Sequence, residues 1–191
     1  RSTTPTTTST GPHLAADGRT DDTASLTRLA EAARQRHEPL ILPAATILVA
    51  GWQVPPGLVV RGAGRSTILK LHPQAKDPYV PVIDLDGTHD VTLEDLAVDG
   101  NRTQFASVRT EWKHGIRIVD ATTITLNRLT IADCMGDGIY IGRGIVGGSD
   151  GQVRSLRVTS VTVSGSYRNN VSIIDLTDGE FTDCVFTLAK G

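Results

Sequence analysis

The stretch Val91-Thr-Leu-Glu-Asp-Leu-Ala-Val98 places apolar residues at its first, third, sixth and eighth positions. A similar spacing returns at residues 124–131, 156–163 and 181–188, and the first residues of the four stretches are 33, 32 and 25 positions apart. Alternation with a period of two predicts β-strands, and the two-residue step in the middle predicts a bend between two of them. Recurrence at a few tens of residues is typical of a solenoid, in which each coil buries its apolar face against the next.

A second set of short apolar strands precedes each repeat, at residues 83–85, 116–118, 139–141 and 171–173. Three of these strands follow Gly115, Gly138 and Asn170, which tolerate the left-handed backbone of a corner. Each coil should therefore carry about three short strands that stack into parallel sheets. We aligned the last repeat by its first residue, Phe181, which leaves Asp183 in an inward column and predicts a less regular last coil.

Composition agrees with a single solenoid domain. The 191 residues are 39% hydrophobic but only 4% aromatic, as expected for stacked ladders of Val, Ile and Leu. A net charge of −2 argues against a nucleic-acid partner. No apolar run approaches the roughly 20 residues of a membrane span, so we expect a soluble protein without a membrane partner.

The chain divides into three parts. Residues 1–12 are rich in Ser, Thr and Pro and predict a flexible linker of the kind common in exported proteins, which favours a secreted or cell-surface location. Residues 13–76 should hold a capping α-helix, near 22–36, and the first irregular coils, with 61–65 as a coil corner. Residues 77–191 should hold the regular coils. Because the sequence stops three residues after Leu188 without a polar cap, we expect the β-helix to be truncated there and to continue in a C-terminal part of the same protein.

The motifs at 17–24, 60–65 and 68–71, together with Val98-Asp-Gly-Asn-Arg102 and Gly136-Asp-Gly-Ile-Tyr-Ile141, resemble the pectate-lyase-like superfamily. The resemblance covers residues 14–191. It implies an all-β, right-handed parallel β-helix that binds a long polysaccharide along one sheet. The superfamily includes polysaccharide lyases, glycoside hydrolases, mannuronan epimerases and phage tailspikes. This chain lacks the Asp-Pro-His triplet of the epimerases after Gly138, and the paired aspartates and Gly-His-Gly of the polygalacturonases.

Stacking should align the outward residues of the first strand in each coil, ~4.8 Å apart per rung. This row contains Asp84, Arg117, Tyr140 and Ser172. We predict that Tyr140 is exposed in a glycan groove and that His114 and Asp137 reach the same face from the corners before their strands. The candidate catalytic residues are therefore Asp137, Tyr140 and His114, because a carboxyl, a phenol and an imidazole can each transfer protons. The structural alternative is that corner Asp and Asn residues bond only their own backbone.

The longest insertion, residues 99–114, brings cations and aromatic rings to the same edge. Arginine and lysine suit the carboxylates of an acidic glycan, and an aromatic ring can stack on a sugar or simply pack the loop onto the coil. The candidate substrate-binding residues are Asp84, Lys113, Arg117, Trp112, Arg143 and Asn169.

Three functions remain open from the sequence: a polysaccharide lyase, a glycoside hydrolase that uses Asp84 and Asp137, and a non-catalytic carbohydrate-binding or structural β-helix. A calcium ion is an option if Asp133 and Asp137 share a site, although no cofactor is required. Cys134 and Cys184 should be free thiols, because their coil positions are ~7–10 Å apart along the axis, at or beyond the reach of a disulfide.

Overall fold

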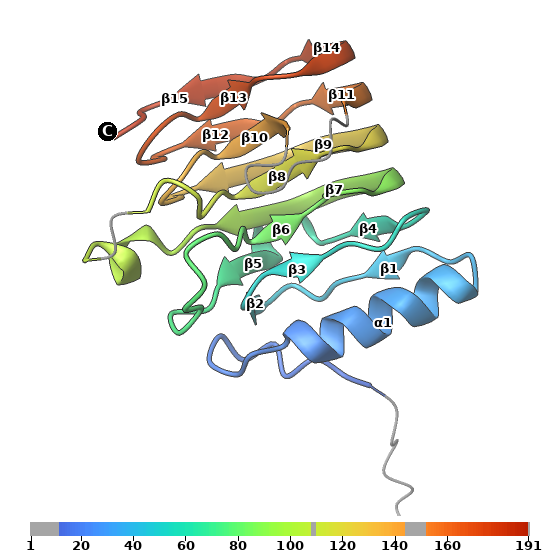
Figure 1. Ribbon diagram of the computed structural model, residues 1–191. Coiled ribbons are helices and arrows are strands. Elements are labelled where there is room, and N and C mark those ends of the chain that lie inside the picture. Colours follow the sequence, from blue (N-terminus) through green and yellow to red (C-terminus); the bar gives the residue numbers. More distant parts are fainter. Residues whose placement is uncertain (1–11, 108–109, 144–151, 191) are drawn as a thin grey trace, which may run out of the picture.

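The computed structural model describes residues 12–107, 110–143 and 152–190, and these form a right-handed parallel β-helix (Figure 1). Most of the predicted linker, residues 1–11, lies outside this part of the chain. The described strands are β1 (Leu40–Ile41), β2 (Thr46–Val49), β3 (Trp52–Gln53), β4 (Val59–Arg61), β5 (Ile68–Leu71), β6 (Ile83–Asp84), β7 (His89–Asp99), β8 (Ile116–Val119), β9 (Thr122–Ala132), β10 (Ile139–Gly142), β11 (Val153–Thr159), β12 (Thr162–Ser164), β13 (Val171–Ile173), β14 (Leu176–Thr182) and β15 (Val185–Thr187). Two short 3₁₀ turns, η1 (Gly64–Ser66) and η2 (Arg102–Phe105), occupy corners.

The strands form two sheets, and their pairings are parallel, as the repeat predicted. In the ten-stranded sheet A, the order β1-β4-β7-β9-β11-β14 is extended by β2, β5, β12 and β15. The five-stranded sheet B has the order β13-β10-β8-β6-β3. Its register pairs Ile139 with Ile116 and with Val171, so the second set of short strands stacks as predicted.

A column of left-handed residues bends sheet A at each coil. Asp95, Arg128, Ser160 and Asp183 have φ values of 54°, 51°, 54° and 52°, and the first three lie where the sequence predicted a bend. This column corrects our alignment of the last repeat. Phe181 pairs with Val158 and Phe186 pairs with Val163, two positions away from the register that we predicted. Asp183 is therefore a corner residue and does not interrupt an inward column.

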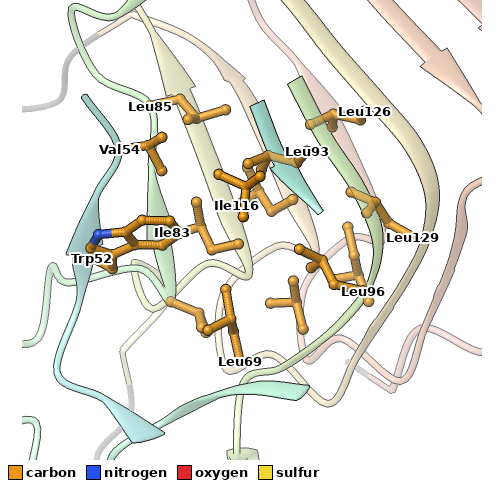
Figure 2. Close-up of a cluster of buried hydrophobic side chains, with 14 of the residues drawn as sticks. Trp52, Val54, Leu69, Ile83, Leu85, Leu93, Leu96, Ile116, Leu126 and Leu129 are labelled. Atoms are coloured by element: carbon orange, nitrogen blue, oxygen red, sulfur yellow. The ribbon is translucent and has the colours of Figure 1, made fainter. Parts of the chain in front are cut away.

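The core consists of apolar ladders between the sheets (Figure 2). Ile83 and Ile116 from sheet B face Leu93 and Leu126 from sheet A, and all four are 0% exposed. Burying such a side chain contributes about 1.5–3 kcal/mol, and each coil repeats the contribution. The rigid stack fixes the positions of the outward residues on sheet B.

Helix α1 (Thr23–Gln35) covers the first coil, as predicted (Figure 1). Leu26, Ala30 and Ala33 are its buried residues and belong to the core. The Asp22 carboxylate accepts the N–H groups of Ala15 and Ala16, at 2.7 and 2.8 Å, and makes no side-chain cap to the helix. The helix therefore shields a sheet edge that would otherwise be open.

The coil at the other end has exposed apolar side chains, among them Ile174, Phe186 and Leu188. Cys134 and Cys184 are both free, as predicted. Within the described residues, no helix has the length and apolar character needed to cross a membrane.

Candidate functional site on the outer face of sheet B

The predicted outward row exists on sheet B. Backbone register places Arg117 beside Asp84 on one side and beside Tyr140 on the other, and Tyr140 lies beside Ser172. Successive strands are held by parallel ladders, so the four side chains follow one another along the β-helix axis. A line of this kind offers repeated contacts to an extended ligand.

Asp84 and Arg117 form a two-point ion pair on this face. Arg117 Nε and Nη2 donate to the two carboxylate oxygens of Asp84 at 3.0 and 2.6 Å, and Nη2 is also 3.8 Å from Asp86. The Asp84 side chain is only 14% exposed. Two parallel charge-assisted hydrogen bonds hold both groups in place, so the Asp84 carboxylate is already engaged by Arg117.

His114, Asp137 and Asn169 occupy the same corner position in three successive coils and form a polar ladder. The Asp137 N–H donates to His114 Nδ1 at 2.9 Å, and the Asn169 N–H donates to Asp137 Oδ1 at 3.1 Å. Asn169 Nδ2 then donates to Ser172 Oγ at 3.1 Å, which connects the ladder to the outward row. These side chains lie at one edge of sheet B, as predicted, but His114 and Asp137 are buried there and do not reach the outer face.

The ladder is buried and incompletely bonded. His114 is 1% exposed and Asp137 is 0% exposed. Within the described residues, His114 Nε2 and Asp137 Oδ2 have no hydrogen-bond partner. Most buried polar groups in proteins are paired. These two atoms, on neighbouring residues of the ladder, are therefore available to a further hydrogen-bond partner.

Burial sets the protonation of both residues. It lowers the pKa of His114 from 6.5 to about 3, with smaller contributions from Arg117 and Arg168. Because Nδ1 accepts an N–H, the neutral ring carries its proton on Nε2, where it can only donate. Burial also raises the pKa of Asp137. The carboxyl therefore holds its proton closer to neutral pH than an ordinary aspartate does, which suits proton transfer.

Tyr140 is buried, contrary to our prediction of an exposed side chain. It is 8% exposed because its ring stacks on His114, with centroids 4.9 Å apart and planes at 18°. Its hydroxyl donates to the Arg143 carbonyl at 3.1 Å. Burial raises the pKa of Tyr140, so its phenol ionises less readily than that of an ordinary tyrosine.

Lys113 does not lie on the outer face of sheet B, which corrects its predicted role in substrate binding. Its ammonium group donates to the carbonyls of Ala75 and Asp77 and lies 4.7 Å from the Phe105 ring centroid. The side chain is 1% exposed and anchors the 99–114 insertion to the preceding coil. A charge placed this way stabilises the loop and is unavailable to a ligand.

Trp112 and Arg143 border the row. Trp112 contacts Tyr79 with ring centroids 6.3 Å apart and His114 at 6.4 Å, so aromatic rings continue from Tyr140 toward the preceding coil. Tyr79 is 46% exposed and was missed by the sequence analysis. Arg143 pairs with Asp175 at 2.8 Å.

The sequence analysis also missed Arg168. Its Nη1 is 3.1 Å from Glu111 Oε2, and its Nε is 4.0 Å from Asp137 Oδ1. Arg168 stands three residues before β13, the position that Lys113 has before β8, and this shared register could have identified it. It is the cation that adjoins the predicted catalytic carboxyl.

Calcium does not fit this corner. The described residues contain no cluster of three or more His, Cys, Asp or Glu that could hold a metal ion. Asp137 Oδ1 accepts from Asn169, whereas Asp133 faces Lys190 at 3.9 Å. The two aspartates therefore do not form a shared oxygen cage.

No family model and no curated protein matches the sequence. Among solved structures, an iota-carrageenase complexed to iota-carrageenan fragments is similar, with a TM-score of 0.70 and 14% identity over 88% of this chain. Tailspike protein gp49 from the Acinetobacter baumannii bacteriophage Fri1, a capsular polysaccharide depolymerase, gives 0.69 and 17% over 90%. Bacteriophage phi29 gene product 12 in its pre-mature form gives 0.66 and 17% over 91%. The chain spans 38%, 32% and 26% of these three proteins, respectively. At such identities the likeness shows the right-handed parallel β-helix fold.

Proposed function

We propose that this chain belongs to a secreted or cell-surface carbohydrate-active enzyme and binds a long acidic polysaccharide along the outer face of sheet B. The observation that carries the proposal is the register of Asp84, Arg117, Tyr140 and Ser172 on adjacent strands. Arg117 on this face matches the carboxylates or sulfates of such a polymer, and the rings of Tyr79 and Trp112 at its border match the ring faces of the sugars. The iota-carrageenase and the tailspike depolymerase have the same fold and act on polysaccharides, which supports this class of ligand.

Asp137 is the group that we assign to proton transfer. In an elimination its carboxylate would take the proton beside the uronate carboxyl, the electron pair would form the new double bond, and the glycosidic oxygen would leave with a proton from the Tyr140 hydroxyl. In a hydrolysis its protonated form would instead protonate the leaving oxygen while a second carboxylate takes a proton from the water that attacks the sugar. The tight Asp84–Arg117 ion pair disfavours Asp84 as the second carboxyl of a hydrolase, so elimination is the preferred reaction.

A second candidate is a non-catalytic glycan-binding β-helix. The observation that favours it is the burial of Asp137 and His114, at 0% and 1% exposure, because a substrate cannot reach either group without a local opening. In that case the polar ladder would serve only to connect the coils.

The test uses the full chain with alginate, polygalacturonate, iota-carrageenan and neutral galactan. Cleavage is followed by new reducing ends, and elimination by the ultraviolet absorbance of the unsaturated product. Asp137→Asn should slow a catalysed reaction about 10²-fold or more, and Tyr140→Phe comparably if its hydroxyl transfers a proton. Asp95→Asn, on the outer corner of sheet A, is the matched control and should leave the rate unchanged.

Binding without cleavage would favour the second candidate. Failure to bind or cleave any acidic polymer would contradict the proposed function. Equal rates in Asp137→Asn and the wild type would move the chemistry away from the polar ladder.

A further inference from the structure

Arg168 and Glu111 form an ion pair at the edge of sheet B. Their closest atoms, Nη1 and Oε2, are 3.1 Å apart, and the side chains are 33% and 53% exposed. On its other side, Arg168 Nε is 4.0 Å from Oδ1 of Asp137, whose side chain is 0% exposed. One guanidinium thus lies between an exposed carboxylate and a buried one.

The ion pair bridges the corner that holds Asp137. Lys113, Gly136 and Arg168 are stacked, because Gly136 N donates to the Lys113 carbonyl at 2.8 Å and Arg168 N to the Gly136 carbonyl at 3.4 Å. A Cβ on Gly136 would be 2.6 Å from the Glu111 carbonyl oxygen and 2.8 Å from His114 Nδ1. The backbone of Glu111 therefore lies against the middle corner, and its side chain reaches across to Arg168 in the next coil.

This bridge is more easily exchanged than the other arginine pairs along the face. Arg117 is held by Asp84 and Arg143 by Asp175, and both of these carboxylate side chains are only 14% exposed. Glu111 is largely in solvent, where an ion pair contributes little to stability. An anion on a bound polymer can replace Glu111 at a smaller cost than it could replace Asp84 or Asp175.

We infer, on the basis of the proposed function, that Arg168 recognises an anionic substituent of the glycan by exchanging Glu111 for it, and that this exchange uncovers Asp137. The substituent is a carboxylate or a sulfate, since a guanidinium binds either through paired hydrogen bonds. Binding of the anionic group by Arg168 and exposure of the Asp137 carboxyl then occur together. A polymer without anionic groups does not expose Asp137.

The first experiment measures the affinity of the full chain for alginate and iota-carrageenan oligosaccharides, with neutral galactan oligosaccharides as the uncharged probe. Arg168→Gln should weaken binding of the preferred anionic probe about ten- to hundredfold, the range for a lost charge-assisted hydrogen bond. Glu111→Gln should strengthen it several-fold by removing the internal competitor. Arg157→Gln is the matched control, because Arg157 is 47% exposed and pairs with Glu180 on sheet A.

Two comparisons make the result specific. In the Arg168→Gln background, Glu111→Gln should no longer strengthen binding if it acts through Arg168, whereas a general charge effect would persist. Alginate and iota-carrageenan distinguish a uronate from a sulfate. Loss of binding to the galactan probe in Arg168→Gln would instead indicate general damage to the face and would contradict the inference.

The second experiment needs no glycan. Carbodiimide labelling of carboxyl groups, read by mass spectrometry, should modify Asp137 slowly in the wild type and several-fold faster in both Glu111→Gln and Arg168→Gln, with no change in Arg157→Gln. Equal labelling in all four proteins would overturn the covering role of the bridge. Unchanged anionic binding in Arg168→Gln would overturn the recognition role alone, whereas a wild type that binds no anionic probe would overturn both the inference and the proposed function.

Discussion

Two columns of corner residues recur along this β-helix, and they differ in whether their charged side chains are exposed and paired or buried and incompletely paired. The left-handed column of sheet A pairs its charges at the surface, as where Arg128, which is 50% exposed, binds Asp95 at 2.7 Å and Glu94 at 3.0 Å. The polar ladder beside sheet B holds Asp137 and His114 in the interior with unpaired atoms. At an exposed corner with paired charges many side chains can be accommodated. At a buried corner with unpaired polar atoms few residue types are tolerated. The difference separates corners that only turn the chain from corners suited to chemistry.

Replacing one residue in each column by alanine should give the largest difference in the free energy of unfolding. His114→Ala removes the acceptor of the Asp137 N–H and the ring stacked on Tyr140, so it should lower the free energy of unfolding by about 2–4 kcal/mol. Arg128→Ala should cause only the small loss usual for surface ion pairs. Urea unfolding at pH 7 measures both, and equal losses would remove the distinction between the columns.

The pH dependence of stability should report the buried histidine. His114 has a pKa of about 3 when folded and 6.5 when not, so the unfolded chain binds a proton more readily between these values. Its contribution is complete above pH 6.5 and is lost as the pH falls toward 3. Between pH 7 and 5 the loss should be on the order of 2 kcal/mol. His114→Gln should flatten this slope in urea unfolding, and a slope as steep as that of the wild type would argue that the ring is already charged.

Replacing an aspartate by asparagine should change the free energy of unfolding in opposite directions in the two columns. Burial raises the pKa of Asp137, so the unfolded chain ionises first and the fold loses stability as the pH rises from the ordinary aspartate range through the raised pKa. Asp137→Asn should therefore raise the free energy of unfolding at pH 7, with the gain disappearing as the pH falls to about 4. Hydrogen bonds from Arg128 lower the pKa of Asp95, so Asp95→Asn should cause a small loss instead. The same sign in both variants would contradict the assignment.

The smallest effect concerns the left-handed backbone itself. Ser160 has φ 54°, a conformation that glycine adopts without strain, so Ser160→Gly should stabilise the fold by about 0.5 kcal/mol. Asn169 in the polar ladder is not left-handed, and Asn169→Gly should destabilise it. Thermal unfolding of the two variants provides the comparison, and a loss in both would indicate that strain at the corners is negligible.

The sequence predicted the solenoid because apolar alternation is a direct consequence of strand geometry. It misplaced the last repeat by two residues because a shift of two keeps every side chain on its own face, and alternation cannot detect it. Aligning Asp183 with Asp95 and Ser160, as corner residues, would have given the register that pairs Phe181 with Val158.

The site was predicted only in part, for a related reason. Backbone register determines which residues are neighbours, so Tyr140 was correctly placed beside Arg117. Exposure depends on how the loops fold over the sheet, and register does not predict it. Tyr140 is covered by its stack on His114, and Lys113 turns inward to Ala75. Arg168 was missed because its partners, Glu111 and Asp137, come from two other coils.

The spacing of the left-handed residues along the chain also shows where insertions and deletions can be accommodated. Arg128 and Ser160 are each followed eleven residues later by the first residue of the next sheet B strand, whereas Asp95 is followed 21 residues later by Ile116. In the other direction, Asp183 lies 12 residues after Val171, but Ser160 lies 21 residues after Ile139. In sequence, one longer stretch precedes a sheet B strand and the other follows one, and the bend recurs in spite of them. Insertions and deletions can therefore accumulate at the borders of one face while the stack of coils is unchanged, so that this face can change during evolution faster than the scaffold that holds it.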